Sequence, residues 1–347
     1  MNKSAVRKDI KKNRFSYVDV LKNLFPWKGD PASEKIRKTV FMIAVIIFGV
    51  CAYLIFNYFY GIYKNNKMYE GLQEDMPSLA EMITPEVTNV VGSSEMLPYM
   101  QNMIERIGND DIVGWIQIPD KNGSCDDTKV DYPIVQKTTE HEREFYLNHN
   151  IYKEYTGEVP GSIFLDWRSR LGTHDQSDIL VIYGHQMKDG SMFGSLLNYD
   201  HYYSFYGEHP CIELSSRYEV STYKIFGFFY ADGGETESEF RYFDAINFNS
   251  EQEFYDYVNQ IKRRSLRIND VDVKYGDDLL VLSTCATDYF EDARFAVAAR
   301  KLRPGEDKYA GTQNSSRNEN PLMPIEWYKA KGDGVTYDSN AEFIPYG

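Results

Sequence analysis

The stretches 277–285 (DDLLVLSTC) and 294–302 (RFAVAARKL) decide the fold of this chain of 347 residues. Each is a short, mostly apolar run, and eight residues connect them, which predicts two neighbouring antiparallel strands. In a hairpin of this spacing Cys285 lies opposite Arg294, whereas Arg300 lies about 20 Å further along the strand. The pattern therefore places a thiol and a single guanidinium together at the rim of a sheet.

Similar short runs fill the chain before this hairpin. Between residues 112 and 231 they read IVGWIQI, YPIVQ, GSIFLD, DILVIYGH, CIEL and STYKIFGFFYA, and Gly, Pro, Asp and Asn separate them. Many short strands punctuated by turn residues are typical of a β-barrel or a β-sandwich. At about 150 residues per domain, the region beyond residue 64 is long enough for one large or two small domains.

Two segments carry a helical pattern instead. Residues 95–108 place four apolar side chains on one face, namely Met100, Met103, Ile104 and Ile107. Residues 250–268 begin with Ser250 as a helix N-cap and Glu253 as its capping-box partner. The apolar face of this second helix consists of Phe254, Tyr257, Val258 and Ile261. We expect both helices to pack on the outside of the strands.

The N-terminal region predicts a membrane anchor. Residues 1–39 hold eleven Lys and Arg against four Asp and Glu, and residues 40–63 (VFMIAVIIFGVCAYLIFNYFYGIY) contain no charge over about 36 Å of helix. The aromatic residues after the apolar run disfavour a cleaved signal peptide, which is the alternative. The basic flank keeps residues 1–39 in the cytoplasm and exports the remainder, with 64–92 as an extracellular stalk.

The exported part is strongly acidic, since the whole chain has a net charge of -14 despite its basic start, and this excludes a general nucleic-acid binder. Residues 304–347 predict an irregular extension with Trp327 and Tyr328 as docking points. Cys51 lies in the span, and we expect Cys125 and Cys211 to remain free thiols. Since the sequence has no CxxC motif or Cys/His cluster, we expect no metal site.

Three side chains have the positions that thiol chemistry requires. Cys285 ends a strand, Arg294 faces it, and His185 ends the apolar strand DILVIYGH at another rim position. A nucleophilic thiolate needs neighbouring positive charge and a proton carrier, and a cationic donor can stabilise an oxyanion. The other histidines lie in polar segments where surface exposure is expected: His141, His149, His174, His201 and His209.

On these motifs the chain resembles the sortases, and within them class B. The matching pieces are LSTC at 282–285 with the Arg-containing strand after it, YGHQM, DIVGWIQIP, DYPIVQ, YLNHN and GSIFLDWR, in the order of the family and over about residues 95–303. The resemblance implies a closed mixed β-barrel as a catalytic domain at 93–303, mainly β with α, with an N-terminal helix and a long helix inserted before the last strands. Ala286 stands where some members have a glutamate.

Transferred by position, the resemblance implies Cys285 as nucleophile, His185 as general acid and base, Arg294 as oxyanion stabiliser and Ser283 as a substrate contact. It implies a cysteine transpeptidase of the Gram-positive cell surface that needs no cofactor. Its partners would be exported proteins with a sorting motif of the NPxTN or LPxTG type and an amine of a peptidoglycan precursor or pilin. A pilin-polymerising sortase and a catalytically silent surface-binding relative are the alternatives; the spacing typical of L,D-transpeptidases is missing.

Overall fold

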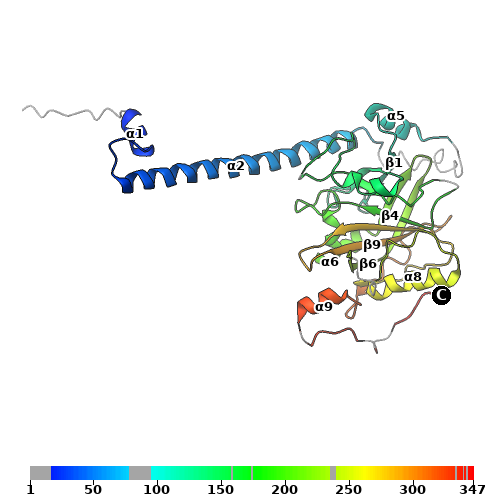
Figure 1. Ribbon diagram of the computed structural model, residues 1–347. Helices are drawn as coiled ribbons and strands as arrows, with labels where there is room; N and C mark the ends of the chain where they lie inside the picture. Colours follow the sequence, from blue (N-terminus) through cyan, green and yellow to red (C-terminus); the bar gives the residue numbers. More distant parts are fainter. Residues whose placement is uncertain are drawn as a thin grey trace, which may run out of the picture. The chain divides into compact units, whose positions relative to one another are not determined.

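The computed structural model describes residues 17–77, 95–157, 159–172, 175–234, 240–332, 334–338, 340 and 343–347. The chain divides into two compact units, Met1–Gly61 and Ile62–Gly347, and each is described by itself. Figure 1 labels the elements along the chain.

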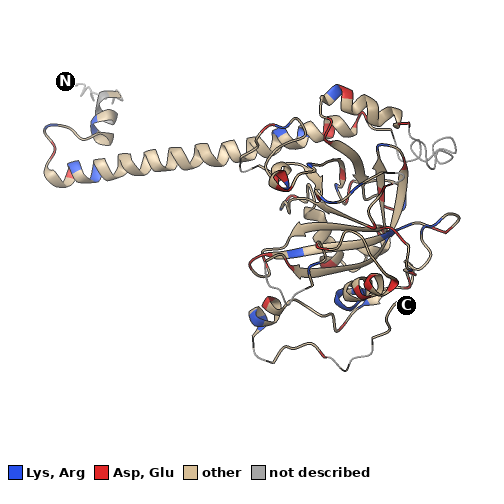
Figure 2. Cartoon of the chain, turned by 45° about the vertical axis from the view of Figure 1, so that its right-hand side comes forward, with Lys and Arg blue, Asp and Glu red and all other residues tan. Residues whose placement is uncertain are grey.

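The first unit contains α1 (Tyr17–Leu24) and most of α2 (Ala32–Gln73). Near the start of α2, the Lys38 Nζ atom donates hydrogen bonds to Asp30 Oδ2 at 2.8 Å and to the Lys22 carbonyl oxygen at 2.6 Å. The helix is long and apolar enough to cross a membrane, and it contains the predicted span 40–63. Figure 2 shows the uncharged stretch of α2 with charged residues near its beginning.

The second unit is built on a closed barrel of eight strands in the order β1-β2-β3-β4-β8-β9-β6-β5. The pairs β2/β3 and β4/β8 are parallel and the other neighbours are antiparallel. The strands are β1 (Ile112–Gln117), β2 (Asp131–Val135), β3 (Ile163–Leu165), β4 (Ile179–Tyr183), β5 (Cys211–Ser216), β6 (Val220–Asp232), β8 (Leu279–Cys285) and β9 (Ala293–Lys301). The predicted closed mixed barrel is confirmed.

The barrel strands β4 and β8 carry apolar residues on both faces. One face packs in the interior of the barrel and the other packs under helix α8 (Glu251–Arg264). Leu180, Ile182, Leu280 and Leu282 belong to the large inner core, whereas the alternate residues of both strands pack in a second cluster with α8. The helix contributes the four predicted apolar residues to this cluster. This placement confirms that α8 covers the outside of the barrel.

The helix α8 begins as predicted and ends earlier. Ser250 Oγ accepts from the Glu253 backbone N–H at 3.2 Å, and the Glu253 carboxylate accepts from the Asn249 N–H at 2.8 Å. The predicted end at 268 is wrong, because Ser265 leaves the helical conformation and β7 (Arg267–Ile268) pairs with β10 (Ser316–Arg317). The basic residues at 262–264 occupy the last turn, where the helix dipole favours cations.

The remaining helices lie in the connections of the second unit. In α5 (Pro98–Ile107) the four predicted apolar residues are buried, and Gly108 ends the helix with a positive φ of 71°. The short helical turns are η1 (Glu140–Glu142), η2 (Phe145–Leu147), η3 (Gly194–Leu197), α6 (Asn198–His201) and α7 (Phe205–Glu208).

The segment expected to be a stalk starts as ordered helix. α2 continues to Gln73, and Tyr69 and Leu72 are buried in the core of the second unit. The Tyr69 hydroxyl donates to the Gly161 carbonyl at 3.2 Å, and Gln73 Nε2 donates to the Asp131 carbonyl at 2.7 Å. The expectation of a stalk is therefore not met at 64–73, and residues 78–92 lie outside the described part of the chain.

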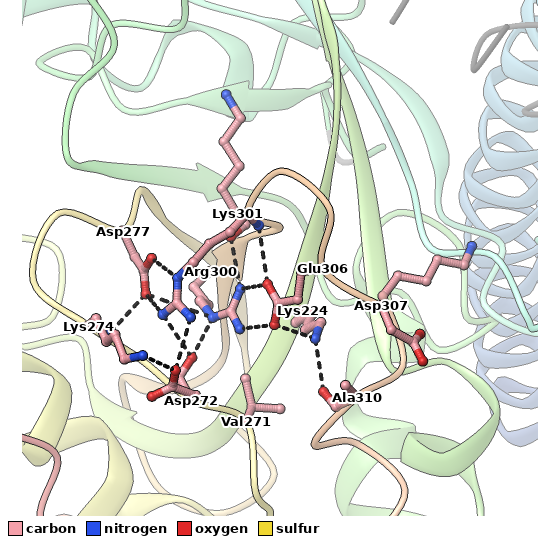
Figure 3. Close-up of polar contacts among 12 residues, drawn as sticks. Lys224, Val271, Asp272, Lys274, Asp277, Arg300, Lys301, Glu306, Asp307 and Ala310 are labelled. Atoms are coloured by element: carbon pink, nitrogen blue, oxygen red, sulfur yellow. Dashed lines mark hydrogen bonds and ion pairs between the residues drawn. The ribbon is translucent and has the colours of Figure 1, made fainter. Parts of the chain in front are cut away.

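The C-terminal extension is attached to the barrel by a buried ion network (Figure 3). Arg300 on β9 and Lys224 on β6 are completely buried. Glu306 binds both, at 2.5 and 2.7 Å from two guanidinium nitrogens of Arg300 and 2.6 Å from Lys224 Nζ. The extension then forms α9 (Ile325–Lys331), and Trp327 and Tyr328 pack against the main core. It is therefore more regular than expected.

Candidate active site

The strands β4 and β8 bring His185 and Cys285 to the same rim. The two strands are parallel neighbours, with Tyr183 beside Ser283 in the register. Beyond this pair the Gly184 N–H donates to the Ser283 carbonyl at 3.1 Å, and the Thr284 hydroxyl donates to the Gly184 carbonyl at 2.8 Å. Because parallel strands end on the same side, His185, the second residue after β4, and Cys285, the last residue of β8, lie at the same rim.

The hairpin of β8 and β9 places Arg294 beside Cys285. In the register Cys285 lies opposite Arg294, and Leu279 lies opposite Arg300. The predicted register is confirmed, and Arg300 belongs to the ion network with Glu306 instead of the rim.

A groove of about 580 Å³ lies over this rim. Cys285, His185, Arg294 and Ser283 all line it, and Cys285 is only partly buried. Its walls come from the η1–η2 segment, the residues after β3 and the segment between β6 and α8. A thiol, an imidazole and a guanidinium therefore line one accessible cleft.

The ring of His185 is oriented by main chain. Its Nε2 lies 2.6 Å from the Leu147 carbonyl oxygen at the end of η2, so Nε2 carries the proton and donates it. Nδ1 is then the basic nitrogen of this tautomer. Within the described residues, the ring of His185 bonds to Leu147 and makes no hydrogen bond to Cys285.

The guanidinium of Arg294 is positioned by the neighbouring backbone. Its Nη1 donates to the Asp292 and Ala293 carbonyls at 3.1 and 3.2 Å. The side chain passes directly over Gly233, where an added Cβ would lie 2.8 Å from both Cζ and Nε of Arg294. Only glycine leaves this approach open.

We therefore expect Gly233→Ala to displace the Arg294 guanidinium. With the role that the family resemblance implies for Arg294, this should lower the turnover of a sorting-motif peptide by up to about 100-fold, since small misplacements in an active site have effects of that size. The measurement is kcat, with the unfolding midpoint beside it. The control is Gly207→Ala, where an added Cβ meets nothing within 4 Å. Unchanged kcat in Gly233→Ala would show that the position of Arg294 does not depend on this glycine.

Ser283 is hydrogen-bonded to a tyrosine that the sequence analysis did not identify. Its Oγ lies 2.5 Å from the Tyr242 hydroxyl, and both side chains are almost completely buried at the floor of the groove. Burial raises the pKa of Tyr242 to about 12, so the phenol stays protonated. The substrate contact predicted for Ser283 stays a prediction. Tyr242 lines the same part of the groove as Ser283.

Arg168 joins two walls of the groove. Its Nε and Nη2 atoms form a bidentate pair of hydrogen bonds with the Asp166 carboxylate, each 2.9 Å long. Nη2 also donates to the Phe243 carbonyl at 2.5 Å. Tyr183 donates its hydroxyl to Asp166 at 3.0 Å, and burial raises the pKa of this phenol. Arg168 thereby fixes the segment between β6 and α8 to the barrel.

The other cysteines differ from Cys285 in their surroundings. Cys125 and Cys211 are free, and burial raises the pKa of each thiol to about 12. Neither forms a significant amount of thiolate at neutral pH. Cys51 is exposed on α2. Cys285 is thus the one cysteine of the described residues that lines the groove.

The histidines other than His185 were expected on the surface. His141 and His201 are exposed, and His149 is partly buried against Phe145, with ring centroids 3.9 Å apart. His209 is completely buried, so the expectation was wrong there; it lies between α7 and β5 and packs on Phe205. His174 lies outside the described residues.

Two proteins that are similar to this chain in sequence carry the name sortase B. The chain is 34% identical over 196 residues to sortase B of Listeria monocytogenes, covering 55% of this chain and 70% of that protein. It is 28% identical over 267 residues to sortase B of Staphylococcus aureus, covering 77% and 95%. No family model matches the sequence.

Solved structures show the same similarity. The Staphylococcus aureus sortase B–substrate complex matches with a TM-score of 0.54 at 27% identity, over 70% of this chain and 98% of that chain. A Bacillus anthracis protein described as similar to sortase B matches with a TM-score of 0.53 at 28% identity, over 70% and 98%.

Proposed function

The chain belongs to the class B sortases, which are cysteine transpeptidases, and we propose that it cleaves a sorting motif in exported proteins after its threonine and joins the protein to a cell-wall amine. The observation that supports this proposal best is that three side chains with complementary chemistry lie at one rim of the barrel. Cys285 faces Arg294 across one hairpin, and His185 ends the parallel neighbouring strand. The motif is of the NPxTN or LPxTG type.

In the proposed reaction Cys285 gives its thiol proton to His185, and the resulting thiolate attacks the carbonyl carbon of the threonine. Arg294 donates hydrogen bonds to the oxyanion, and His185 protonates the departing amine, which leaves a thioester on Cys285. The incoming amine then transfers a proton to His185 and attacks the thioester, so the new peptide bond forms as the C–S bond breaks and Cys285 leaves as the thiolate. In the absence of an amine, water would release the acid.

The proposed location of the protein in the membrane rests on the apolar part of α2. We propose that residues 40–63 span the membrane with 1–39 in the cytoplasm, because basic residues flank the start of the span. The catalytic unit would then lie outside the cell, where exported proteins and peptidoglycan precursors meet.

The experiment that tests the function uses the full chain in detergent with a panel of sorting-motif peptides and amines. Mass spectrometry of the products should show cleavage after the threonine and a new amide with the amine. Preference for a lysine-containing pilin peptide over a peptidoglycan peptide would support the pilin-polymerising alternative. Peptide binding without cleavage by any member of the panel would favour the catalytically silent relative.

For the role of Arg294 we expect Arg294→Ala to reduce kcat by about 10²–10³-fold, as the loss of an oxyanion donor does. Arg294→Lys should recover little, because an ammonium does not reproduce the planar guanidinium. The control is Arg317→Ala, an arginine whose side chain is 63% exposed on β10. Full activity of Arg294→Ala would remove this residue from the mechanism.

A further inference from the structure

The buried imidazole of His209 has no partner that explains its burial. The residue is completely buried, and neither ring nitrogen has a hydrogen-bond partner among the residues that the structure describes. Buried polar groups are nearly always satisfied, so two buried ring nitrogens without a hydrogen-bond partner in the protein need a partner from outside the chain.

The carboxylates of Asp127 and Glu208 lie close to the His209 ring. The Asp127 Oδ2 atom lies 3.9 Å from His209 Nε2, and Glu208 supplies a third ligand atom. These atoms all lie within 4.8 Å of one another. Ligand atoms around one ion at about 2.0–2.2 Å must approach one another more closely than that. Asp127 and Glu208 are exposed, so their side chains are free to close the remaining gap.

The backbone that carries these ligands is fixed on both sides. The His209 N–H donates to the Phe205 carbonyl at 2.9 Å, and the Tyr199 hydroxyl donates to the His209 carbonyl at 2.7 Å. Beside Asp127, the Thr128 hydroxyl donates to the Ile118 carbonyl at 2.7 Å. The positions of the ligand-bearing residues are therefore set before any ion arrives.

We propose that Asp127, Glu208 and His209 bind a divalent transition-metal ion such as Zn²⁺. An imidazole nitrogen with two carboxylates is a donor set that suits Zn²⁺, whereas Ca²⁺ and Mg²⁺ prefer oxygen ligands throughout. Three protein ligands leave the fourth position of a tetrahedral ion to water. The ion would connect the loop between β1 and β2 to the junction of α7 and β5.

The proposed metal site is separate from the groove that contains Cys285. Its occupation is expected to show in metal binding and in thermal stability. None of the three ligands lines the groove that contains Cys285. The loop that carries Asp127 also supports the segment after His185, because Lys129 Nζ donates to the Asp189 carbonyl at 2.5 Å. Metal binding and thermal stability are therefore the primary readouts, and neither depends on the proposed transpeptidation.

The test titrates Zn²⁺ into the metal-free full chain in detergent, prepared without a polyhistidine tag and with Cys285→Ala so that the groove thiol cannot bind the ion. We expect one ion per chain, a higher thermal midpoint with Zn²⁺ and no comparable effect of Mg²⁺ or Ca²⁺. The double variant Asp127→Asn/Glu208→Gln should weaken binding at least tenfold and lose the Zn²⁺-dependent rise in midpoint.

The matched control is Asp126→Asn, an exposed neighbour outside the cluster, which should bind Zn²⁺ as the parent does. Equal midpoints of the metal-free forms would show that the double variant is folded. Co²⁺ as a probe should give a spectrum without a sulfur-to-metal charge-transfer band. Absence of stoichiometric binding, binding that is unchanged in the double variant, or a thiolate band would each overturn the proposal.

Discussion

Cys285→Ala should abolish both cleavage of a sorting peptide and its transfer to an amine, with the fold intact. The thiol is the proposed nucleophile, and alanine at this partly buried position removes only the sulfur. The measurement is the rate of peptide cleavage together with mass spectrometry of the intact protein after incubation with peptide. Wild type should show a thioester adduct that hydroxylamine or an acceptor amine removes.

Cys125→Ala and Cys211→Ala are the matched controls, and both should keep the two reactions largely unchanged. The raised pKa of each thiol also predicts that a thiol reagent at neutral pH modifies Cys285 well before these two. The comparison is made in a Cys51→Ser background, since Cys51 is exposed. A peptide adduct on the Cys285→Ala protein would contradict the proposed mechanism.

Glu306→Gln should lower the free energy of unfolding by about 3–5 kcal/mol at neutral pH, the usual cost of removing one partner of a buried ion pair. The glutamine keeps the size of the side chain but leaves Arg300 and Lys224 buried without its charge. The nearest remaining carboxylate to Arg300 is Asp277, at 3.8 Å. Urea unfolding followed by tryptophan fluorescence measures the difference.

Glu326→Gln is the control for this substitution. It removes a carboxylate that also lies 2.6 Å from a lysine, but this pair is exposed, and the expected loss is at most about 0.5 kcal/mol. Losses of similar size in the two variants would show that the network with Arg300 has no special role.

The same carboxylate predicts a pH dependence. Hydrogen bonds from Arg300 hold the pKa of Glu306 well below its ordinary value of 4.5. A lowered folded-state pKa stabilises the protein above the unfolded-state pKa, and the stabilisation declines as the pH falls below it. The difference in stability between wild type and Glu306→Gln should therefore narrow below about pH 4.5. A difference independent of pH would contradict this origin.

The parts of the fold that the sequence could predict are those with a regular pattern. The register of Cys285 against Arg294 followed from two apolar runs and the length of their connection, and the face of α8 followed from its apolar spacing. The end of a strand is also visible in sequence, which is why His185 could be chosen among six histidines.

Residues in irregular segments gave no such signal. Gly233 and Tyr242 lie between β6 and α8, where no period indicates which side chain turns toward the groove. The burial of His209 depends on its packing against Phe205 and on the β1–β2 loop, which is distant in sequence. In α2, Tyr69 and Leu72 are too few to form an apolar stripe, so the order of residues 64–73 could not be seen.

The position of Glu306 in the chain has a consequence for the order in which the protein is completed. Synthesis proceeds from the N-terminus, so Lys224 and Arg300 are made before the carboxylate that neutralises them. A nascent chain that ends just after β9 has all eight barrel strands but two cations whose burial without a carboxylate partner is unfavourable. Lys224 also donates to the Ala310 carbonyl at 2.9 Å. A fragment that ends before residue 306 therefore lacks the carboxylate that pairs with both cations, and we expect it to be less stable than one that extends past residue 310.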